Sequence, residues 1–191
     1  MSEQQTYNPY VSVDCVVFGF DGEKLKVILI ERNIAENNEM FNDKKLPGSM
    51  ILESEDLDDA ANRILSELTG LKNIYLSQFK SFGNPLRTSN PRDLLWLQNT
   101  MHLKEGRIVT IAYLALIKIN QKIQFNSDVA KAKWLDVNEM KNMNMAFDHK
   151  EIIEEGLKFI KKSVDLEPHL LFELLPRKFT LSQLRSLYDL V

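Results

Sequence analysis

The chain has 191 residues, enough for one domain of ordinary size with an appendage or for two small domains, and this length excludes two full-sized domains. Hydrophobic residues make up 44% and charged residues 27% of the chain, and no apolar run approaches the roughly 18 residues of a membrane span. The net charge of −3 excludes a general attraction to nucleic acid, so any DNA contact needs a local basic surface.

Three further features bear on compartment and metal binding. Residues 1–7 are polar and lack the basic and apolar regions of a secretory signal, so we expect a cytoplasmic protein. The lone cysteine, Cys15, stands in an apolar run and is expected to be a buried thiol without a disulfide. His102, His149 and His169 lack metal-ligand spacing, which gives a zinc site little support and favours solvated or capping histidines.

The first predicted elements form a hairpin. The β-rich segments 11–20 and 24–32 flank Asp21-Gly22-Glu23, a strong turn signal because glycine tolerates a positive φ. Segment 35–45 is polar, and its composition predicts a loop that Pro47-Gly48 closes.

A helix is predicted next, over residues 55–71. Asp56 or Asp58 near its start complements the helix dipole, and Gly70 is placed to end it. Its apolar residues recur at three- and four-residue intervals and therefore share one stripe. The stripe consists of Leu57, Ala60, Ala61, Ile64, Leu65 and Leu68.

Two further strands are predicted at 74–81 and 108–119, the second apolar on both sides and therefore central in the sheet. The segment between them, 82–106, is too long for a simple loop, and long ordered insertions are often functional. We expect a short amphipathic helix at 94–103 around Trp96, which could stack on a base or sugar but is more often a core residue.

The remaining elements of this region are a short strand at 132–135, a short helix from Asn138, and a clear amphipathic helix at 148–163. The order of strands and helices predicts an α/β fold in which helices sandwich a mixed sheet.

The helix at 55–71 resembles the signature of the Nudix family, G-x5-E-x7-R-E-U-x-E-E-x-G-U with U aliphatic. Ile64 and Leu68 stand where the family has two further glutamates, and Ser49, which follows Gly48, stands at the opening glycine. The resemblance covers residues 8–164 and implies the Nudix α/β/α sandwich. The signature residues kept in register are Glu55, Arg63, Leu65, Glu67, Gly70 and Leu71.

Nudix hydrolases use Mg²⁺ held by carboxylates of this helix to cleave a diphosphate. Since Ile64 and Leu68 cannot bind a cation, the resemblance implies a degenerate site with no catalytic residues and no cofactor. Its residual signature residues are Glu55, Arg63 and Glu67. If the chain were active, Mg²⁺ would bind Glu55 and Glu67. The alternative for Arg63 and Glu67 is a solvated i,i+4 ion pair.

The C-terminal segment carries a second resemblance. Thr180 followed by Gln183 predicts a capping box, and the apolar residues that follow predict a helix that packs on something. Residues 174–188 resemble the entry helix of the winged-helix domain in Nudix-related transcriptional regulators of the NrtR and AraR type. We therefore divide the chain into a Nudix-like domain, 1–165, and the start of an incomplete winged helix, 166–191.

A winged helix needs roughly twice the length of that C-terminal segment, so DNA binding is expected only if the domain is completed beyond Val191. The resemblance also implies a homodimer. The leading hypothesis is a catalytically degenerate sensor of a sugar or nucleotide-sugar, either ADP-ribose-like or a pentose. The alternatives are a Mg²⁺-dependent pyrophosphohydrolase of nucleoside-diphosphate sugars and a non-catalytic interaction module.

Five residues are candidate ligand contacts. Asp14 is a carboxylate inside an apolar strand, and Arg107 directly precedes the predicted central strand. Arg87 and Arg92 offer forks for phosphate or sugar hydroxyls, with a solubilising loop as the alternative. Arg32, at the end of the second strand, completes the set. The sequence leaves open the identity of the ligand, the operator and the direction of regulation.

Overall fold

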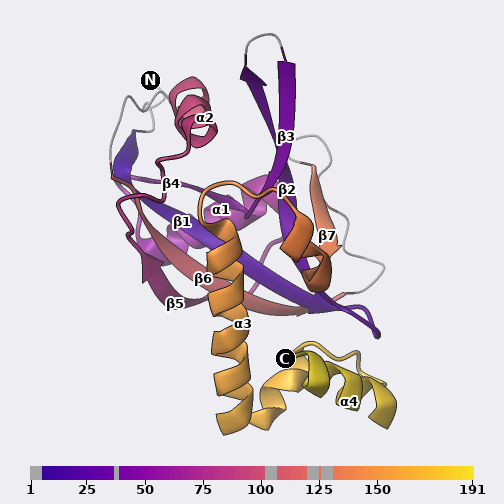
Figure 1. Cartoon of the computed structure of the whole chain (residues 1–191). Helices are drawn as coiled ribbons and strands as arrows, with labels where there is room; N and C mark the ends of the chain where they lie inside the picture. Colours follow the sequence, from indigo (N-terminus) through magenta and orange to yellow (C-terminus); the bar gives the residue numbers. More distant parts are fainter. Residues whose placement is uncertain (1–5, 37–38, 102–106, 120–124, 126–130) are drawn as a thin grey trace.

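The structure is a computed structural model that describes residues 6–36, 39–101, 107–119, 125 and 131–191. Its centre is one seven-stranded sheet (Figure 1) in the order β3-β2-β1-β6-β5, with β4 paired to β1 and β7 paired to β2. The β1–β6 pair is parallel and the other pairs are antiparallel, so the sheet is mixed. The strands are β1 (Tyr7–Phe20), β2 (Leu25–Glu36), β3 (Glu39–Lys45), β4 (Gly48–Leu52), β5 (Ser77–Phe82), β6 (Val109–Lys118) and β7 (Ala132–Asp136).

Helices lie on both faces of this sheet, as the sequence predicts. Along β1, alternate side chains point to opposite faces. Val13, Cys15 and Val17 pack with α1 on one face, and Val16 and Phe18 belong to the core on the face of α3. The helices are α1 (Leu57–Thr69), α2 (Pro91–Met101), α3 (His149–Leu166) and α4 (Leu181–Leu190), with short 3-10 helices η1 (Val137–Asn142) and η2 (Pro168–Glu173).

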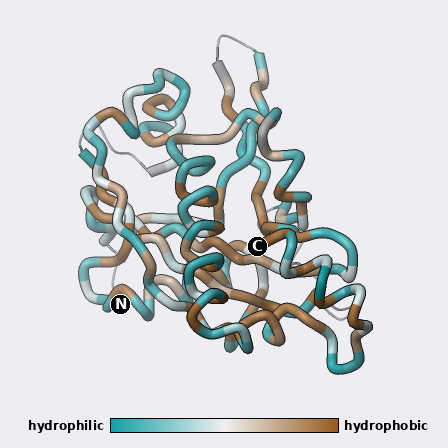
Figure 2. Tube along the Cα trace, turned by 60° about the horizontal axis from the view of Figure 1, so that its bottom comes forward, coloured by the Kyte–Doolittle hydropathy of each residue, from teal (hydrophilic) through white to brown (hydrophobic). Residues whose placement is uncertain are grey.

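The hydrophobic pattern of the chain follows these layers. Figure 2 shows hydrophobic stretches in the middle of the molecule and, at intervals, along the turns of the helices. Strand β6 is buried along most of its length between β1 and β5, which confirms the predicted central strand. Cys15 is fully buried, also as predicted. In the described part of the chain, no helix is long and apolar enough to cross a membrane.

The predicted boundaries of α1 are confirmed within two residues. Asp56 is its N-cap and accepts a hydrogen bond from the Leu57 N–H at 2.6 Å. Gly70 ends the helix with a φ of 79°, the left-handed conformation that glycine adopts without strain. Ile64 and Leu65 are fully buried under the sheet, and Leu68 is half-buried.

The loop predicted at 35–45 is wrong. Strand β2 continues to Glu36 and pairs with β3, with Arg32 opposite Asp43 in the register. Because β3 is the outermost strand of the sheet, most of its side chains are polar, and that polarity resembles a loop. Strand β4, at Gly48–Leu52, also goes unpredicted, because five residues give too short a pattern.

The insertion contains α2 at Pro91–Met101, three residues earlier than predicted, and the rest of the predicted helix lies outside the described residues. Asn90, before Pro91, has a side chain that accepts a hydrogen bond from the Arg92 N–H at 2.9 Å. The helix therefore begins at a turn and a proline, as proline at the first helical position favours.

The C-terminal segment packs on the sandwich. The capping box at Thr180 and Gln183 is confirmed, with Gln183 N–H to Thr180 Oγ1 at 3.2 Å and Thr180 N–H to Gln183 Oε1 at 3.0 Å. Of the predicted apolar face of α4, Leu187 is buried, whereas Leu181 and Tyr188 are exposed. The division of the chain at residue 165 stays a prediction. Four leucines of the C-terminal segment share the core of the α3 face: Leu171, Leu174, Leu175 and Leu187.

Candidate functional site

A small cavity of about 40 Å³ opens where β1, β4, α2 and the start of α3 meet. At roughly 10–15 Å³ for each water molecule, this space holds about three waters. Its wall combines charged, hydroxyl and aromatic side chains, as ligand sites commonly do. The lining residues are Ser12, Asp14, Lys45, Gly48, Ser49, Met50, Arg87, Trp96, Leu97, Ile108, Phe147 and His149.

Asp14 is a buried carboxylate at the wall of the cavity. Thr110 Oγ1 donates to its Oδ2 at 2.7 Å, and its Oδ1 lies 3.4 Å from His149 Nε2. A β-carbon added at Gly48 would lie 1.8 Å from Asp14 Oδ1, so only glycine leaves room for this carboxylate. The sequence shows a carboxylate inside an apolar strand, which is unusual. In the structure, this carboxylate belongs to a buried polar cluster on the face of the sheet that α3 covers.

His149, the first residue of α3, is held neutral. The Leu46 N–H donates to its Nδ1 at 2.9 Å, which places the ring proton on Nε2, facing Asp14. Burial lowers the pKa of His149 to about 4. The expectation of a solvated or capping histidine is wrong for His149. Its side chain is buried and accepts a hydrogen bond from the backbone N–H of Leu46, which is distant in the sequence. His169 is exposed, and His102 lies outside the described residues.

Arg87 forms a two-pronged ion pair behind the cavity wall. Its Nε and Nη2 donate to the two carboxylate oxygens of Asp148 at 2.8 and 2.7 Å, and Nη2 lies 3.8 Å from Asp14. This fork geometry fixes the guanidinium and ties the long insertion to the start of α3. The structure thus brings Arg87 and Asp14, two of the five candidate ligand contacts, into one cavity.

Lys45, at the end of β3, is a buried amine with carbonyl partners. Its Nζ donates to Gly48 O at 2.7 Å and to Leu46 O at 3.4 Å, and it lies 5.5 Å from the centroid of the Trp96 ring. Among the described residues, no carboxylate lies within ion-pair distance of it. Burial lowers its pKa to about 8.

Arg32 lies beside the cavity and does not line it. It is buried, pairs with Asp43 through two hydrogen bonds, and lies 2.7 Å from Asp93. Its guanidinium carbon is 5.6 Å from the ring centroid of Trp96 and 5.2 Å from that of Phe147, the two aromatic residues of the cavity. Arg32 therefore links β2, β3 and α2 and supports the aromatic part of the wall.

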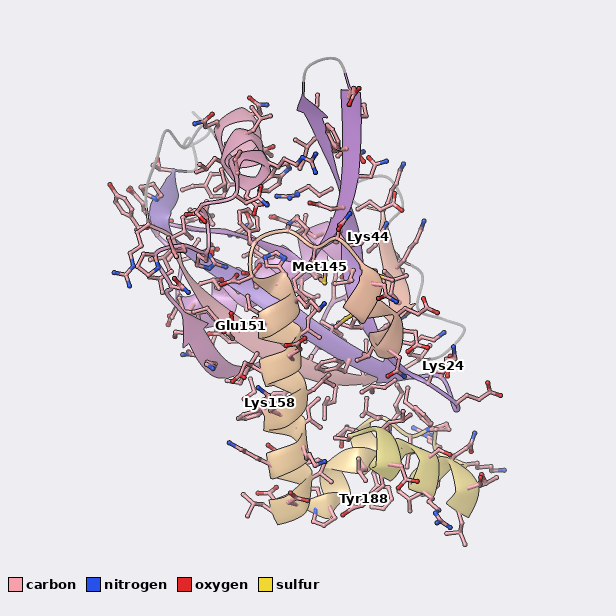
Figure 3. All side chains as sticks on the ribbon, viewed as in Figure 1. Lys24, Lys44, Met145, Glu151, Lys158 and Tyr188 are labelled. Atoms are coloured by element: carbon pink, nitrogen blue, oxygen red, sulfur yellow. The ribbon has the colours of Figure 1, made fainter. Side chains whose placement is uncertain are left out.

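The loop before α3 holds Phe147 in place. Figure 3 shows Met145, in this loop, beside Lys44 of β3, and the two residues form an isolated parallel bridge. The Ala146 N–H donates to Lys44 O at 2.8 Å, and the Phe147 N–H donates to Asp93 Oδ2 at 3.1 Å. The edge strand β3 thus supplies both Lys45 and the support for the opposite wall.

The other two candidate contacts lie away from the cavity lining. The guanidinium carbon of Arg92 lies 3.8 Å from the ring centroid of Phe41, and Arg107 Nη2 donates to Gly83 O at 2.7 Å. Both side chains are exposed. Their roles as ligand contacts stay predictions, as do those of Asp14, Arg32 and Arg87.

The residual signature residues Glu55, Arg63 and Glu67 form their own network on the other side of β4. Arg63 donates from Nε and Nη2 to the two oxygens of Glu55 at 2.8 and 2.5 Å, and from Nη1 to Glu67 at 3.1 Å. The Leu52 N–H also donates to Glu55, at 2.7 Å. Arg63 Nη2 lies 3.3 Å from the carbonyl oxygen of Met50, whose side chain lines the cavity.

The comparison with protein families decides the identity of the fold. Residues 8–156 match the family model of the NUDIX domain. The chain belongs to the Nudix family. Its seven-stranded mixed sheet with helices on both faces is the Nudix sandwich that the signature resemblance implies.

Similar proteins include transcriptional regulators with a Nudix domain. The chain is 27% identical over 186 residues to the ADPR responsive transcriptional repressor NtrR of Acinetobacter baylyi, covering 96% of this chain and 67% of that protein. The crystal structure of Shewanella oneidensis NrtR matches with a TM-score of 0.71 and 27% identity, over 95% of this chain and 77% of that one. The NUDIX domain of Shewanella NrtR complexed with ADP ribose matches with a TM-score of 0.60 and 27% identity, over 79% and 88% of the two chains. The Shewanella protein has also been solved with a 27mer DNA.

The signature positions of this chain are either apolar or already engaged by other groups of the protein. Ile64 is fully buried among apolar side chains, and Glu55 is engaged by Arg63 and a backbone N–H. Glu67 is the one exposed acidic signature residue, and Arg63 holds it at 3.1 Å. In the described part of the chain, no group of three His, Cys, Asp or Glu residues is arranged to hold a metal ion.

Sequence reasoning misses Lys45, Phe147 and His149 as cavity residues of this Nudix domain. Lys45 lies in the segment expected to be a loop, where a lysine gives no signal. The position of His149 depends on its contact with Leu46, 103 residues earlier in the chain. An available signal is the proximity of Phe147, Asp148 and His149 to a predicted helix start, where ligand-binding groups often gather.

Proposed function

We propose that this Nudix domain is the ligand-sensing part of a transcriptional regulator and binds a sugar or nucleotide-sugar of the ADP-ribose type without hydrolysing it. Two relatives at 27% identity support the proposal: an ADPR responsive repressor, and a regulator whose NUDIX domain has been solved with ADP ribose. The cavity between β1, β4, α2 and the start of α3 is the proposed place where part of the ligand enters.

The environment of Ile64 supports the part of the proposal that the ligand is bound without being hydrolysed. Mg²⁺ needs close to six oxygen ligands in octahedral geometry, and Nudix hydrolases supply several from this helix. Here Ile64 is part of the core, Leu68 is half-buried, and Arg63 occupies both oxygens of Glu55. No resident metal or other cofactor is therefore proposed, and the residual signature residues are proposed to hold the helix against β4.

The DNA-binding part of the proposal concerns the C-terminal segment. Shewanella NrtR has been solved with a 27mer DNA, and its match spans 94% of this chain. We propose that α4 is the first helix of a winged-helix domain and that DNA binding belongs to a chain that continues beyond Val191 with the rest of that domain. A homodimer in the cytoplasm is the proposed working form, because a two-fold symmetric dimer matches a palindromic operator.

The test combines a binding assay with a hydrolysis assay. ADP-ribose at a hundredfold excess over its dissociation constant stabilises a protein by about 2.7 kcal/mol, so we expect a rise in melting temperature of about 5 °C or more. The rise is expected with and without Mg²⁺, and chromatography is expected to detect no AMP release. The absence of any shift with ADP-ribose, D-ribose and L-arabinose would contradict the sensor.

Glu67→Gln distinguishes the sensor from the alternative, a Mg²⁺-dependent pyrophosphohydrolase of nucleoside-diphosphate sugars. For a sensor, the variant keeps the ligand-induced shift, because Glu67 is an exposed partner of Arg63 on the far side of β4. Robust Mg²⁺-dependent release of AMP by the natural chain, abolished in Glu67→Gln, would establish the hydrolase instead.

A further inference from the structure

The cavity contains opposite charges that balance one another. Lys45 and Arg87 supply two positive charges, and Asp14 and the Arg87 partner Asp148 supply two negative charges. His149 adds none, because Leu46 occupies its Nδ1. A phosphate group would add at least one negative charge beside the Asp14 carboxylate in a poorly hydrated space, where like-charge repulsion is strong. The balance therefore favours an uncharged group.

The cavity also presents hydrogen-bond acceptors and donors together. The ionised carboxylate of Asp14 accepts only, and Thr110 and His149 use part of its capacity. Lys45 has three donors, of which Leu46 O and Gly48 O take two. Asp148 takes Nε and Nη2 of Arg87, and among the described residues Nη1 has no hydrogen-bond acceptor and is left as a donor. A hydroxyl group both donates and accepts, so a pair of neighbouring hydroxyls fits this arrangement better than a group that only accepts.

Two aromatic rings form part of the remaining wall. Trp96 and Phe147 meet edge to face with ring centroids 6.2 Å apart, and both line the cavity. Aromatic rings offer flat apolar surface to the C–H face of a sugar ring. The volume of about 40 Å³ is far below the roughly 300 Å³ at which whole small-molecule sites begin, so one end of a ligand enters and the rest lies outside.

We propose that this cavity binds the neighbouring hydroxyls of a pentose ring, with Asp14 as their acceptor, Lys45 and Arg87 as donors, and Trp96 with Phe147 as the apolar wall. The proposal rests on the proposed function, because it names the part of the sensed ligand that enters the cavity. The phosphates of a nucleotide-sugar then lie outside it. The same chemistry occurs in the terminal ribose of ADP-ribose, in the ribose of its adenosine half and in a free pentose.

The test is calorimetric titration of the purified chain and of Asp14→Asn with ADP-ribose, ADP and D-ribose. Asparagine keeps the size of the side chain and removes its charge. In Asp14→Asn, a pentose whose hydroxyls enter the cavity no longer finds a charged acceptor there. We therefore expect the variant to bind ADP-ribose at least tenfold more weakly than the natural chain. If ADP affinity changes less than twofold, the terminal ribose is the occupant. An equal loss with ADP assigns the adenosine ribose.

An increase in the affinity of Asp14→Asn for these ligands overturns the proposal. A phosphate in the cavity gains when the neighbouring negative charge is removed, so Asp14→Asn would then bind ADP and ADP-ribose more tightly. Unchanged affinity for ADP-ribose would also overturn it while leaving the sensor function intact. Failure of the natural chain to bind any of the three probes would overturn both. Asp165→Asn, an exposed carboxylate on α3, is the matched control and is expected to bind as the natural chain does.

A second titration does not depend on how well Asp14→Asn folds. The natural chain is titrated with an ADP-ribose analogue that lacks the 2- and 3-hydroxyl groups of the terminal ribose. If that ring occupies the cavity, the analogue binds at least tenfold more weakly than ADP-ribose, because the buried Asp14 and Lys45 lose their partners. Equal affinity excludes the terminal ribose, and equal affinity also for an analogue that lacks the hydroxyl groups of the adenosine ribose contradicts the proposal.

Discussion

Two apolar residues stand at the positions of family glutamates, but they differ in burial. Ile64 is fully buried in the core between α1 and the sheet, whereas Leu68 is half-buried at its margin. An ionised carboxylate at position 64 would have no partner there, and an uncompensated buried charge costs about 3–5 kcal/mol. Ile64→Glu is therefore expected to lower the free energy of unfolding by at least about 3 kcal/mol in urea titrations.

Leu68→Glu is the matched control, because water reaches a new carboxylate at that position. We expect it to cost less than about half as much as Ile64→Glu. Equal stability of Ile64→Glu and the natural chain would mean that the core around α1 is loose enough to admit the family glutamate. The loss of the signature would then reflect selection on chemistry alone.

His149 gives the chain a specific dependence of stability on pH. Burial lowers the pKa of its side chain from 6.5 to about 4 in the folded chain, while the unfolded chain keeps the ordinary value. The unfolded state therefore binds one more proton between these values. The stability that neutral His149 contributes is fully present above pH 6.5 and is lost as pH falls through 4, in total about 3 kcal/mol.

The comparison with His149→Asn isolates this effect, because asparagine does not titrate and its carbonyl oxygen can still accept from the Leu46 N–H. Urea unfolding at pH 7, 6, 5 and 4 is expected to show the natural chain losing about 3 kcal/mol more than the variant over this range. The acidic residues that lie far from His149 affect both proteins alike and cancel in the difference. Parallel profiles would show that the histidine is not held neutral in the folded chain.

The candidate site could be predicted from the sequence only where a residue conflicts with its local pattern. Asp14 is such a residue, a carboxylate in an apolar strand, and it does line the cavity. Lys45 and His149 are residue types that fit their local sequence pattern, so nothing in the sequence marks them. Their burial comes from the packing of β3 against the loop before α3. Arg92 and Arg107 show the converse, since an arginine in a turn-rich segment or just before a strand has the same pattern whether it faces a ligand or solvent.

At the scale of elements, the capping box at the start of α4 makes a local contribution that can be measured. Thr180 and Gln183 satisfy each other's backbone N–H groups. Removal of an N-cap hydroxyl costs about 1 kcal/mol. Thr180→Ala is expected to lower the melting temperature by about 2–4 °C and to speed hydrogen exchange in the first turn of α4.

Ser182→Ala is the control for this prediction, because it removes an exposed hydroxyl from the first turn of the same helix without touching the cap. Its melting temperature is expected to equal or slightly exceed that of the natural chain, since alanine is the better helix former. A similar loss in both variants would assign the effect to the helix surface and not to the cap.

The elements that the sequence predicts well have a strong local pattern of apolar residues. Helix α1 carries six apolar residues on one stripe, and β6 is apolar on both faces. The pair β3 and β4 has no such pattern. Strand β3 is held by its cross-strand pairing with β2, including Arg32 opposite Asp43, and β4 by pairing with β1. Such pairing is a tertiary property, so composition alone assigns β3 to a loop.

At the scale of the whole molecule, α3 connects the cavity to the C-terminal helices. Its first residue, His149, lines the cavity, and Asp148 beside it holds Arg87. Its other end leads into η2 and α4 (Figure 1), and α4 presents Tyr188 to solvent (Figure 3). A ligand that binds Arg87 therefore contacts a residue that is paired with the start of a helix whose far end leads to the proposed DNA-binding segment.

The last prediction concerns whether the C-terminal segment and the sandwich unfold together. Leu174 is fully buried in the same core as Val16 and Phe18 of β1, and truncation of a buried leucine costs about 2–5 kcal/mol. If the core is one cooperative unit, Leu174→Ala shifts the urea midpoint equally by far-ultraviolet circular dichroism and by the emission of Trp96 and Trp134, neither of which lies in the C-terminal segment. Phe172→Ala, at an exposed ring of η2, is expected to cost less than about 1 kcal/mol. A tryptophan midpoint that stays at its natural value while the dichroism shifts would mean that residues 166–191 form a separate folding unit, as the sequence-based division of the chain predicts.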